Sequence, residues 1–442
     1  MHDHASGTAH ARRAVDVLTA PGRRGIAASL SWVGVAVALA GVLTFGYLAI
    51  VTRALPSVDY GWFGAYWSLT LVVAMGAFQP VEVELARLTH LRGTTRPLPP
   101  GSLTTLAGVM GGTLLVVLAG APLLLPALGD EPGLYAALLA VCVVSAGQFL
   151  LRGLLLGRGA YGTHGSVLLL DALLRVLLAA AVAAWLPTSA ATFGWTVPIA
   201  VAVAHLPLLV VLLRRSAPRP LPPAAAPTSR GAVARAVGAL VVGSLCAQVL
   251  LNAAPVLVAG LATPAEQTDA ARFIASFALV RLPLFVAVPL QSALIPSLAE
   301  LDRRGDAPAL RRVAGRLLGG GVLLAVTGGL LGLVVGPALV SLFFGSRYAL
   351  PAPDMAVLAT GTGLSIGLLV ASQALVAAAR HRDAALAWCT GLAAGAVVFA
   401  IVPDLVERAS WAFTTGCAVA FAVAAVLLLR RATTAVPAPD PA

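Results

Sequence analysis

Four charged side chains lie inside long apolar stretches of the sequence, where they could bind an ionic ligand or one another. They are Asp171, Arg175, Arg272 and Arg281. A charge at the centre of a bilayer costs about 2.5 to 3.5 kcal/mol on insertion scales, so each should face protein, water or a ligand. Asp171 and Arg175 are four residues apart and would share one helix face. They predict either a self-neutralising pair or a cavity-lining cation held in place by Asp171.

Arg281 is the strongest candidate for binding an anion. It has no acidic residue three or four positions away, so its partner must come from another helix or from a ligand. A guanidinium group presents forked donors that match phosphate oxygens. Arg272 precedes it by about two and a half helical turns, so the two should not point into one cavity. Arg272 could bind ligand or extend to the membrane interface.

Uncharged polar residues and helix-end charges add further candidates. Gln248 and Asn252 form one polar helix face that could contact sugar hydroxyls or bond to a neighbouring helix. Glu82, Glu84 and Arg87 close another helix, either as a cytoplasmic gate or as solvated charges. Glu82 and Glu84 are two residues apart and are not expected to face the bundle together.

The elements that position these residues are apolar runs long enough to cross a bilayer. The chain has 442 residues, of which 59% are hydrophobic and only 11% charged. Soluble domains carry about 25% charged residues, and one span needs roughly 20 apolar residues. The sequence predicts an all-α integral membrane protein with twelve spans, at about 27–51, 60–83, 103–126, 132–156, 161–186, 193–213, 236–261, 269–295, 312–336, 353–378, 383–403 and 409–430.

Charge in the connections predicts the topology. All 29 basic residues are arginine, and most lie in alternate connections or at the termini. The positive-inside rule therefore puts both termini in the cytoplasm, and Arg152 and Arg158 are predicted among anionic lipid head groups. The predicted parts are a cytoplasmic tail, an N-lobe of helices 1 to 6, a Pro- and Arg-rich linker, a C-lobe of helices 7 to 12 and a second cytoplasmic tail, at 1–26, 27–213, 214–230, 231–430 and 431–442.

The two halves of the chain repeat a pattern of Pro and Gly. Pro56 follows the first helix and Pro264 the seventh, while Gln79-Pro80 is matched by Pro289-Leu290-Gln291. Two six-helix halves of the same orientation imply a pseudo-twofold axis along the membrane normal, with a cavity between two lobes. Chance similarity between apolar segments is the alternative.

Two segments resemble a known transporter superfamily. The connection Arg53-Ala54-Leu55-Pro56-Ser57-Val58-Asp59-Tyr60-Gly61-Trp62-Phe63 resembles that of polysaccharide-biosynthesis flippases, which belong with multidrug efflux and lipid II flippases. Residues 337–348 are similar to the ninth-helix region of the same superfamily. The resemblance implies a MATE-like, two-lobed transporter that moves a lipid-linked oligosaccharide or polyprenyl-phosphate glycan across the cytoplasmic membrane by alternating access. It also implies glycosyltransferases or a polymerase of a polysaccharide pathway as partners, besides membrane lipids.

Other classes of protein fit the sequence less well. Nucleotide-binding and hydrolase motifs are missing, so neither an enzyme nor ATP hydrolysis is expected, and no cofactor or metal site is predicted. The arginine clusters separate apolar runs, which indicates topology rather than nucleic-acid binding.

His205 is predicted as a packing residue or, less favoured, a proton carrier, and the four cysteines as small core residues. A multidrug/cation antiporter and a non-transporting scaffold of a glycan assembly complex remain the alternatives.

Overall fold

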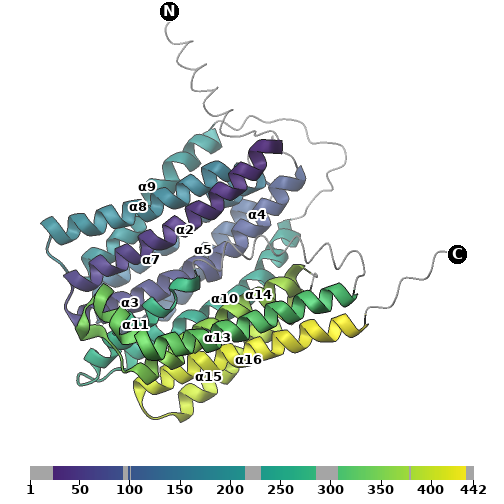
Figure 1. Cartoon of the computed structure of the whole chain (residues 1–442). Helices are drawn as coiled ribbons and strands as arrows, with labels where there is room; N and C mark the ends of the chain where they lie inside the picture. Colours follow the sequence, from purple (N-terminus) through teal and green to yellow (C-terminus); the bar gives the residue numbers. More distant parts are fainter. Residues whose placement is uncertain are drawn as a thin grey trace, which may run out of the picture.

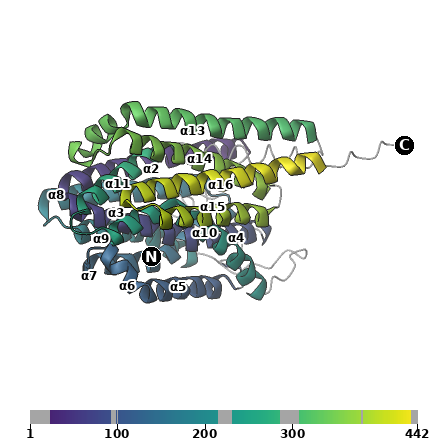
Figure 2. The same ribbon diagram turned by 90° about the horizontal axis from the view of Figure 1, so that it is seen from below.

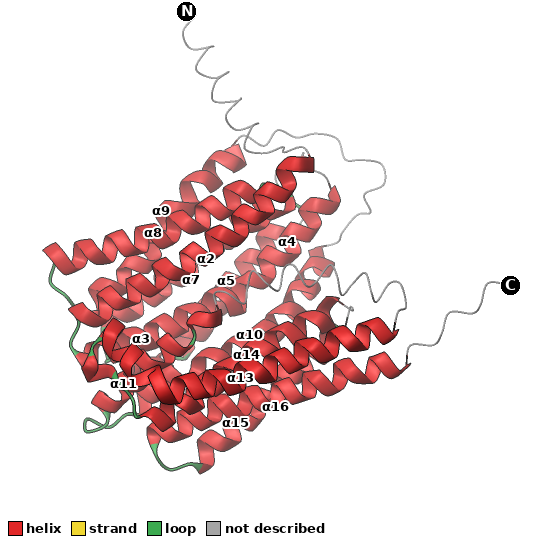
Figure 3. Cartoon of the chain, viewed as in Figure 1, coloured by secondary structure: helices red, strands yellow, loops and turns green. Residues whose placement is uncertain are grey.

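A computed structural model describes residues 23–92, 98–99, 101–214, 230–284, 307–377 and 380–434. Within these ranges the chain is built from helices joined by short loops, without strands (Figures 1 and 3). The elements are α2 (Arg23–Ala54), α3 (Ser57–Leu71), the π-helix η1 (Val72–Phe78), α4 (Gln79–Arg92), α5 (Ser102–Ala119), α6 (Ala121–Ala127), α7 (Pro132–Gly157), α8 (Tyr161–Trp185), α9 (Ala190–Arg214), α10 (Arg230–Leu261), α11 (Gln267–Val280), α13 (Ala307–Phe344), the 3₁₀-helix η2 (Ser346–Tyr348), α14 (Ala352–Ala377), α15 (His381–Ile401) and α16 (Leu405–Thr434).

Eleven of the twelve predicted spans are found among the described residues as helices long enough to cross a membrane. In the described part of the chain, eleven helical segments are long and apolar enough to cross a membrane. The second predicted span is one continuous segment, Ser57–Leu91, which contains η1. Of the eighth, α11 is described, whereas residues 285–295 lie outside the described residues, as do most of both tails and the linker at 214–230. Apolar side chains on the outer helices, such as Val334 at 76% exposure, present the surface that lipid requires.

The helices form two lobes with the same internal packing. In the N-lobe (α2 to α9) the neighbours are α2 with α8, α4 with α7, α5 with α7, α7 with α9 and α8 with α9. The C-lobe (α10 to α16) repeats this order, with α10 on α15, α11 on α14, α13 on α14, α14 on α16 and α15 on α16. Figure 1 shows the lobes side by side, and Figure 2 shows α5 and α13 at opposite edges. The repeated pairing is the structural form of the pseudo-twofold repeat.

Two contacts join the lobes. Helix α10 packs against α3, η1, α4, α5 and α6 of the N-lobe as well as α15 and α16 of its own lobe. The second contact lies at the end of the bundle formed by the loops at 55–56, 262–266 and 345–351, which we call the odd-loop end. There α3 packs against α11, with the Cβ position of Gly61 3.8 Å from Ala271 Cα. The Cβ position of Gly64, one turn on, falls inside the contact distance of Cγ2 of Ile274, so any larger residue there would force the side chain of Ile274 to move.

The packing of α10 on α15 brings two cysteines together. The Sγ atoms of Cys246 and Cys389 are 3.5 Å apart, and both residues are free thiols. Cys142 and Cys417 are buried, as predicted for small core residues, but Cys389 is exposed and Cys246 partly so. A disulfide needs the sulfurs to approach to about 2.05 Å, a small movement.

We therefore expect copper phenanthroline to join Cys246 and Cys389 in membranes, with the disulfide detected by mass spectrometry. Cys389→Ser should abolish it, and Cys142→Ser, in the N-lobe, should not. If both thiols remained free while a maleimide labelled Cys389, the packing of α10 against α15 would be wrong.

Candidate functional site

Three predicted residues, Gln248, Asn252 and Arg281, meet in the C-lobe. Gln248 and Asn252 lie one turn apart on α10, and the amide nitrogen of Asn252 donates to Gln248 Oε1 at 2.9 Å. This leaves Asn252 Oδ1 free to accept from Arg281 Nη1 at 2.8 Å. Arg281 comes directly after α11 and also stacks on Phe277. The Cζ atom of Arg281 lies 5.1 Å from the centroid of the Phe277 ring. Asn252 is fully buried, so the two polar helix residues hold a guanidinium inside the lobe.

The charge of Arg281 has no carboxylate beside it in the described chain. Among the described residues, no Asp or Glu makes an ion pair with it, and its buried Nε has no hydrogen-bond partner. A buried charge with only an amide and an aromatic ring as neighbours is under-compensated. An anion arriving at this point would supply the missing acceptor.

The Arg281 site lies next to the interface with the N-lobe. Ser244 Oγ, one turn before Gln248, donates to the backbone oxygen of Met75 at 2.7 Å. Gly76 in the same π-helix faces α10 so closely that its Cβ position lies 3.6 Å from Gln248 Cβ. A π-helix disturbs the usual pattern of backbone bonds and often occurs at functional sites. The sequence analysis did not predict this π-helix.

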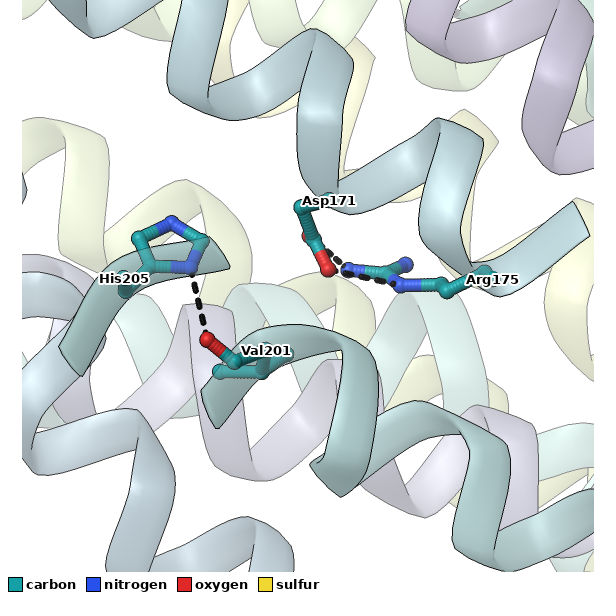
Figure 4. A network of polar contacts seen from close by, with 4 residues as sticks. All are labelled: Asp171, Arg175, Val201 and His205. Atoms are coloured by element: carbon teal, nitrogen blue, oxygen red, sulfur yellow. Dashed lines mark hydrogen bonds and ion pairs between the residues drawn. The ribbon is translucent and has the colours of Figure 1, made fainter. Parts of the chain in front are cut away.

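The N-lobe holds the second predicted pair. Asp171 and Arg175, one turn apart on α8, form an ion pair through both carboxylate oxygens (Figure 4). Asp171 is buried, and Arg175 Cζ lies 5.7 Å from the Trp67 ring of α3. The arrangement is the predicted ion pair, with Arg175 pointing toward protein groups rather than lipid.

Glu82 and Glu84 correct one prediction. Both are buried, contrary to the expectation that only one could face the bundle. Glu82 pairs with Arg152 of α7 at 3.1 Å, and Glu84 with Arg87 at 2.6 Å. Residues two apart point about 200° away from each other, so both are buried only if the helix has neighbours on opposite sides. Helix α4 has α7 on one side, and Glu84 lines a small pocket with α5 and α10 on the other.

Arg152 was also wrongly placed. Its side chain is 11% exposed and lies inside the N-lobe, paired with Glu82 and with its Cζ 4.8 Å from the ring of Phe149. The expectation that it meets lipid head groups does not hold, because α4 supplies a carboxylate that the local sequence around Arg152 cannot show.

Arg272 is separated from the Arg281 site. It pairs with Asp269 at 2.9 Å and donates through Nε to the backbone oxygen of Arg347 at 3.2 Å. Both contacts are at the odd-loop end. Arg272 and Arg281 therefore point into different parts of the lobe, as the spacing between them predicts.

Two arginines that the sequence analysis did not single out join the lobes at the odd-loop end. Arg53, at the end of α2, donates to the backbone oxygens of Leu342 (3.0 Å) and Phe343 (3.2 Å) at the end of α13. Arg347 of the C-lobe donates in turn to the backbone oxygens of Thr52 and Leu55 in the N-lobe. Each guanidinium therefore caps the carbonyl end of the other lobe's helix, where negative partial charge gathers. We call this pair of contacts the arginine latch.

Tyr348 adds to the arginine latch. Its hydroxyl donates to the backbone oxygen of Thr52 at 3.2 Å, and its ring lies 5.3 Å from that of Tyr60. Burial raises the pKa of the Tyr348 hydroxyl, although Arg347 opposes the shift, so the hydroxyl stays protonated and can donate. No group of three His, Cys, Asp or Glu side chains that could hold a metal ion occurs in the described ranges.

Comparison with known sequences gives relatives without an assigned activity. The chain is 29% identical over 432 residues to an uncharacterized protein of Mycobacterium tuberculosis, covering 93% of this chain and 94% of the relative. It is 28% identical over 422 residues to an uncharacterized protein of Mycobacterium bovis, covering 91% and 92%. No protein-family profile matches the chain.

Comparison with solved structures shows the fold. An outward-facing multidrug resistance MATE family transporter of the MOP superfamily matches with a TM-score of 0.61 and 13% identity, covering 92% of this chain and 95% of the other. A MOP superfamily transporter from Pyrococcus furiosus, described as having a binding pocket of reverse polarity that suggests a different function, matches with a TM-score of 0.60, 12% identity and coverage of 92% and 95%. The chain thus has the MATE fold, as its sequence predicted.

Proposed function

We propose that this protein is a transporter that moves a lipid-linked oligosaccharide or a related polyprenyl-phosphate glycan across the cytoplasmic membrane by alternating access. The observation that carries the proposal is Arg281, a buried cation without a carboxylate partner in the described chain, next to the lobe interface. Phosphate oxygens match its free donors, and the amide group of Gln248 is suited to a hydroxyl ligand, whereas Asn252 already bonds to Gln248 and Arg281.

The MATE fold supports transport in general, and the charge of the interior separates the alternatives. A multidrug/cation antiporter needs an acidic group free to bind a cation, whereas Asp171 and Glu82 are each occupied by an arginine. A non-transporting scaffold would have its interior arginines paired with protein carboxylates. Arg175 meets that description, but Arg281 does not in the part of the chain that the structure describes.

Binding of a polyprenyl pyrophosphate to the protein in nanodiscs tests the proposal. Arg281→Ala should weaken binding about 10- to 100-fold, because a hydrogen bond to a charged group contributes roughly 1.5 to 3 kcal/mol. Arg281→Lys should recover part of the loss, since it keeps the charge but not the fork. Arg408→Ala removes an arginine at the odd-loop end, which stacks on Phe399, and should leave affinity unchanged.

Native mass spectrometry can report the affinity, with the uncharged polyprenyl alcohol as the ligand control. Equal affinity of the wild-type protein and Arg281→Ala for the pyrophosphate would refute the anion site. Preferential binding of lipophilic cations would favour the antiporter.

A further inference from the structure

The Arg281 site offers an anion a single positive charge. Asn252, which accepts from Arg281 Nη1 at 2.8 Å, is a neutral amide and cancels none of that charge. In the N-lobe, by contrast, Arg152 and Arg175 are each paired with a carboxylate. Within the described ranges, an anion that reaches the Arg281 site would therefore meet one uncompensated unit of positive charge.

The contacts of Arg281 leave one edge of its guanidinium group for a ligand. Nη1 is bound to Asn252, and the ring of Phe277 lies against the group, with its centroid 5.1 Å from Cζ. Nε is buried and has no hydrogen-bond partner in the part of the chain that the structure describes. The N–H bonds of Nε and Nη2 run parallel in the guanidinium plane, a fork that matches two oxygens of one phosphate group. The free edge thus fits a single phosphate.

Gln248 holds this arrangement in place without adding charge. Its Oε1 accepts from the amide nitrogen of Asn252 at 2.9 Å, which turns Oδ1 of Asn252 toward Arg281. Asn252 is fully buried, so this orientation is set by the protein rather than by water. Two neutral amides therefore position the guanidinium, and the charge of the site comes from Arg281 alone.

We propose that the ligand of this site is a polyprenyl glycan with a single phosphate, in which one phosphodiester joins lipid and sugar, rather than a glycan linked through a diphosphate. This inference rests on the proposed function and narrows its ligand. A phosphodiester carries one negative charge, which Arg281 balances, and has two non-bridging oxygens for the free edge. A diphosphate diester carries two negative charges, and the second would be left uncompensated inside the protein.

Competition between two lipids for the full-length protein in nanodiscs tests this class of ligand. The probes are a polyprenyl phosphate carrying one hexose and the diphosphate of the same chain length carrying the same hexose. EDTA is present throughout, so that no divalent cation offsets the second charge of the diphosphate. We expect native mass spectrometry to show the monophosphate bound at least about tenfold more tightly, since tenfold is only about 1.4 kcal/mol.

Two variants change the charge of the site in opposite directions. Asn252→Asp gives Arg281 a carboxylate and should weaken binding of both lipids at least about tenfold, whereas the uncharged Asn252→Ser should keep the preference for the monophosphate. Gln248→Lys adds a second cation one turn away and should move the preference toward the diphosphate. The melting temperature of each variant shows whether it folds.

The wild-type measurement decides the inference without any variant. Equal affinity for the two lipids, or tighter binding of the diphosphate, would overturn it. The proposed function would still stand in that case if Arg281→Ala weakened binding of both lipids. Unchanged affinity of Arg281→Ala for both lipids would instead refute the anion site itself. A monophosphate preference that persisted in Arg281→Ala would also overturn the inference, because another group would then recognise the phosphate.

Discussion

Replacing Glu82 by alanine is expected to lower the free energy of unfolding by about 3 to 5 kcal/mol, since the change leaves Arg152 as a buried and unpaired charge. The two side chains are only 6% and 11% exposed, so water cannot take over the role of the carboxylate. In detergent the melting temperature should fall by about 5 °C or more. Measurement by intrinsic fluorescence or calorimetry checks this.

Glu84→Ala is the matched control for Glu82→Ala. Both carboxylates are buried on α4 and bind an arginine, but the side chain of Arg87 is 54% exposed and can turn to water. The expected cost is about 0 to 1 kcal/mol. The double variant Glu82→Met with Arg152→Met should recover most of the lost stability, because an apolar pair of similar size removes both buried charges. Equal losses for Glu82→Ala and Glu84→Ala would contradict the assigned burial of Arg152.

The spans and the two-lobed fold could be predicted because their signal is local. A run of about 20 apolar residues forms a helix in lipid whatever its neighbours are. Register of Pro and Gly between the halves then indicated the repeat, which the equivalent helix pairings of the lobes confirm. The Asp171–Arg175 pair was equally predictable, because four residues of helix place both on one face.

Contacts between distant segments could not be predicted in the same way. Arg281 required a partner from elsewhere, but only the packing of α11 beside α10 shows that the partner is Asn252. Glu82 and Arg152 are 70 positions apart, and their pairing depends on how α4 and α7 cross. The π-helix at Val72–Phe78 has no sequence signal that was recognised.

The arginine latch was missed for a related reason. Arg53 and Arg347 were not among the predicted site residues, because sequence alone does not show that a loop arginine faces the carbonyl end of a helix from the other lobe. Their bonds cross between α2 and the end of α13, so they exist only while the odd-loop end is closed. Under alternating access, these bonds must break each time that end opens.

Removing the arginine latch should therefore shift the conformational equilibrium toward opening at the odd-loop end. Arg53→Ala with Arg347→Ala deletes four hydrogen bonds, each contributing about 1 kcal/mol at an exposed arginine, so the upper bound is about 4 kcal/mol. Since 1.4 kcal/mol is a tenfold change, losing about a third of that upper bound would already raise the open population about tenfold. Spin labels at Thr188→Cys in the N-lobe and Pro403→Cys in the C-lobe, both exposed positions at this end, would report it as longer distances in a cysteine-free background.

Arg380→Ala is the control for the arginine latch, because Arg380 also donates to a helix carbonyl, that of Leu427, but within one lobe. Its removal should leave the distance distribution of the labels unchanged. If the loss of Arg53 and Arg347 also left the label distances unchanged, the latch would not be needed for closure. The packing of aromatic and small residues between α3 and α11 would then hold this end closed. The direction of the shift matters more than its size, since bonds made in one conformation alone can only favour that conformation.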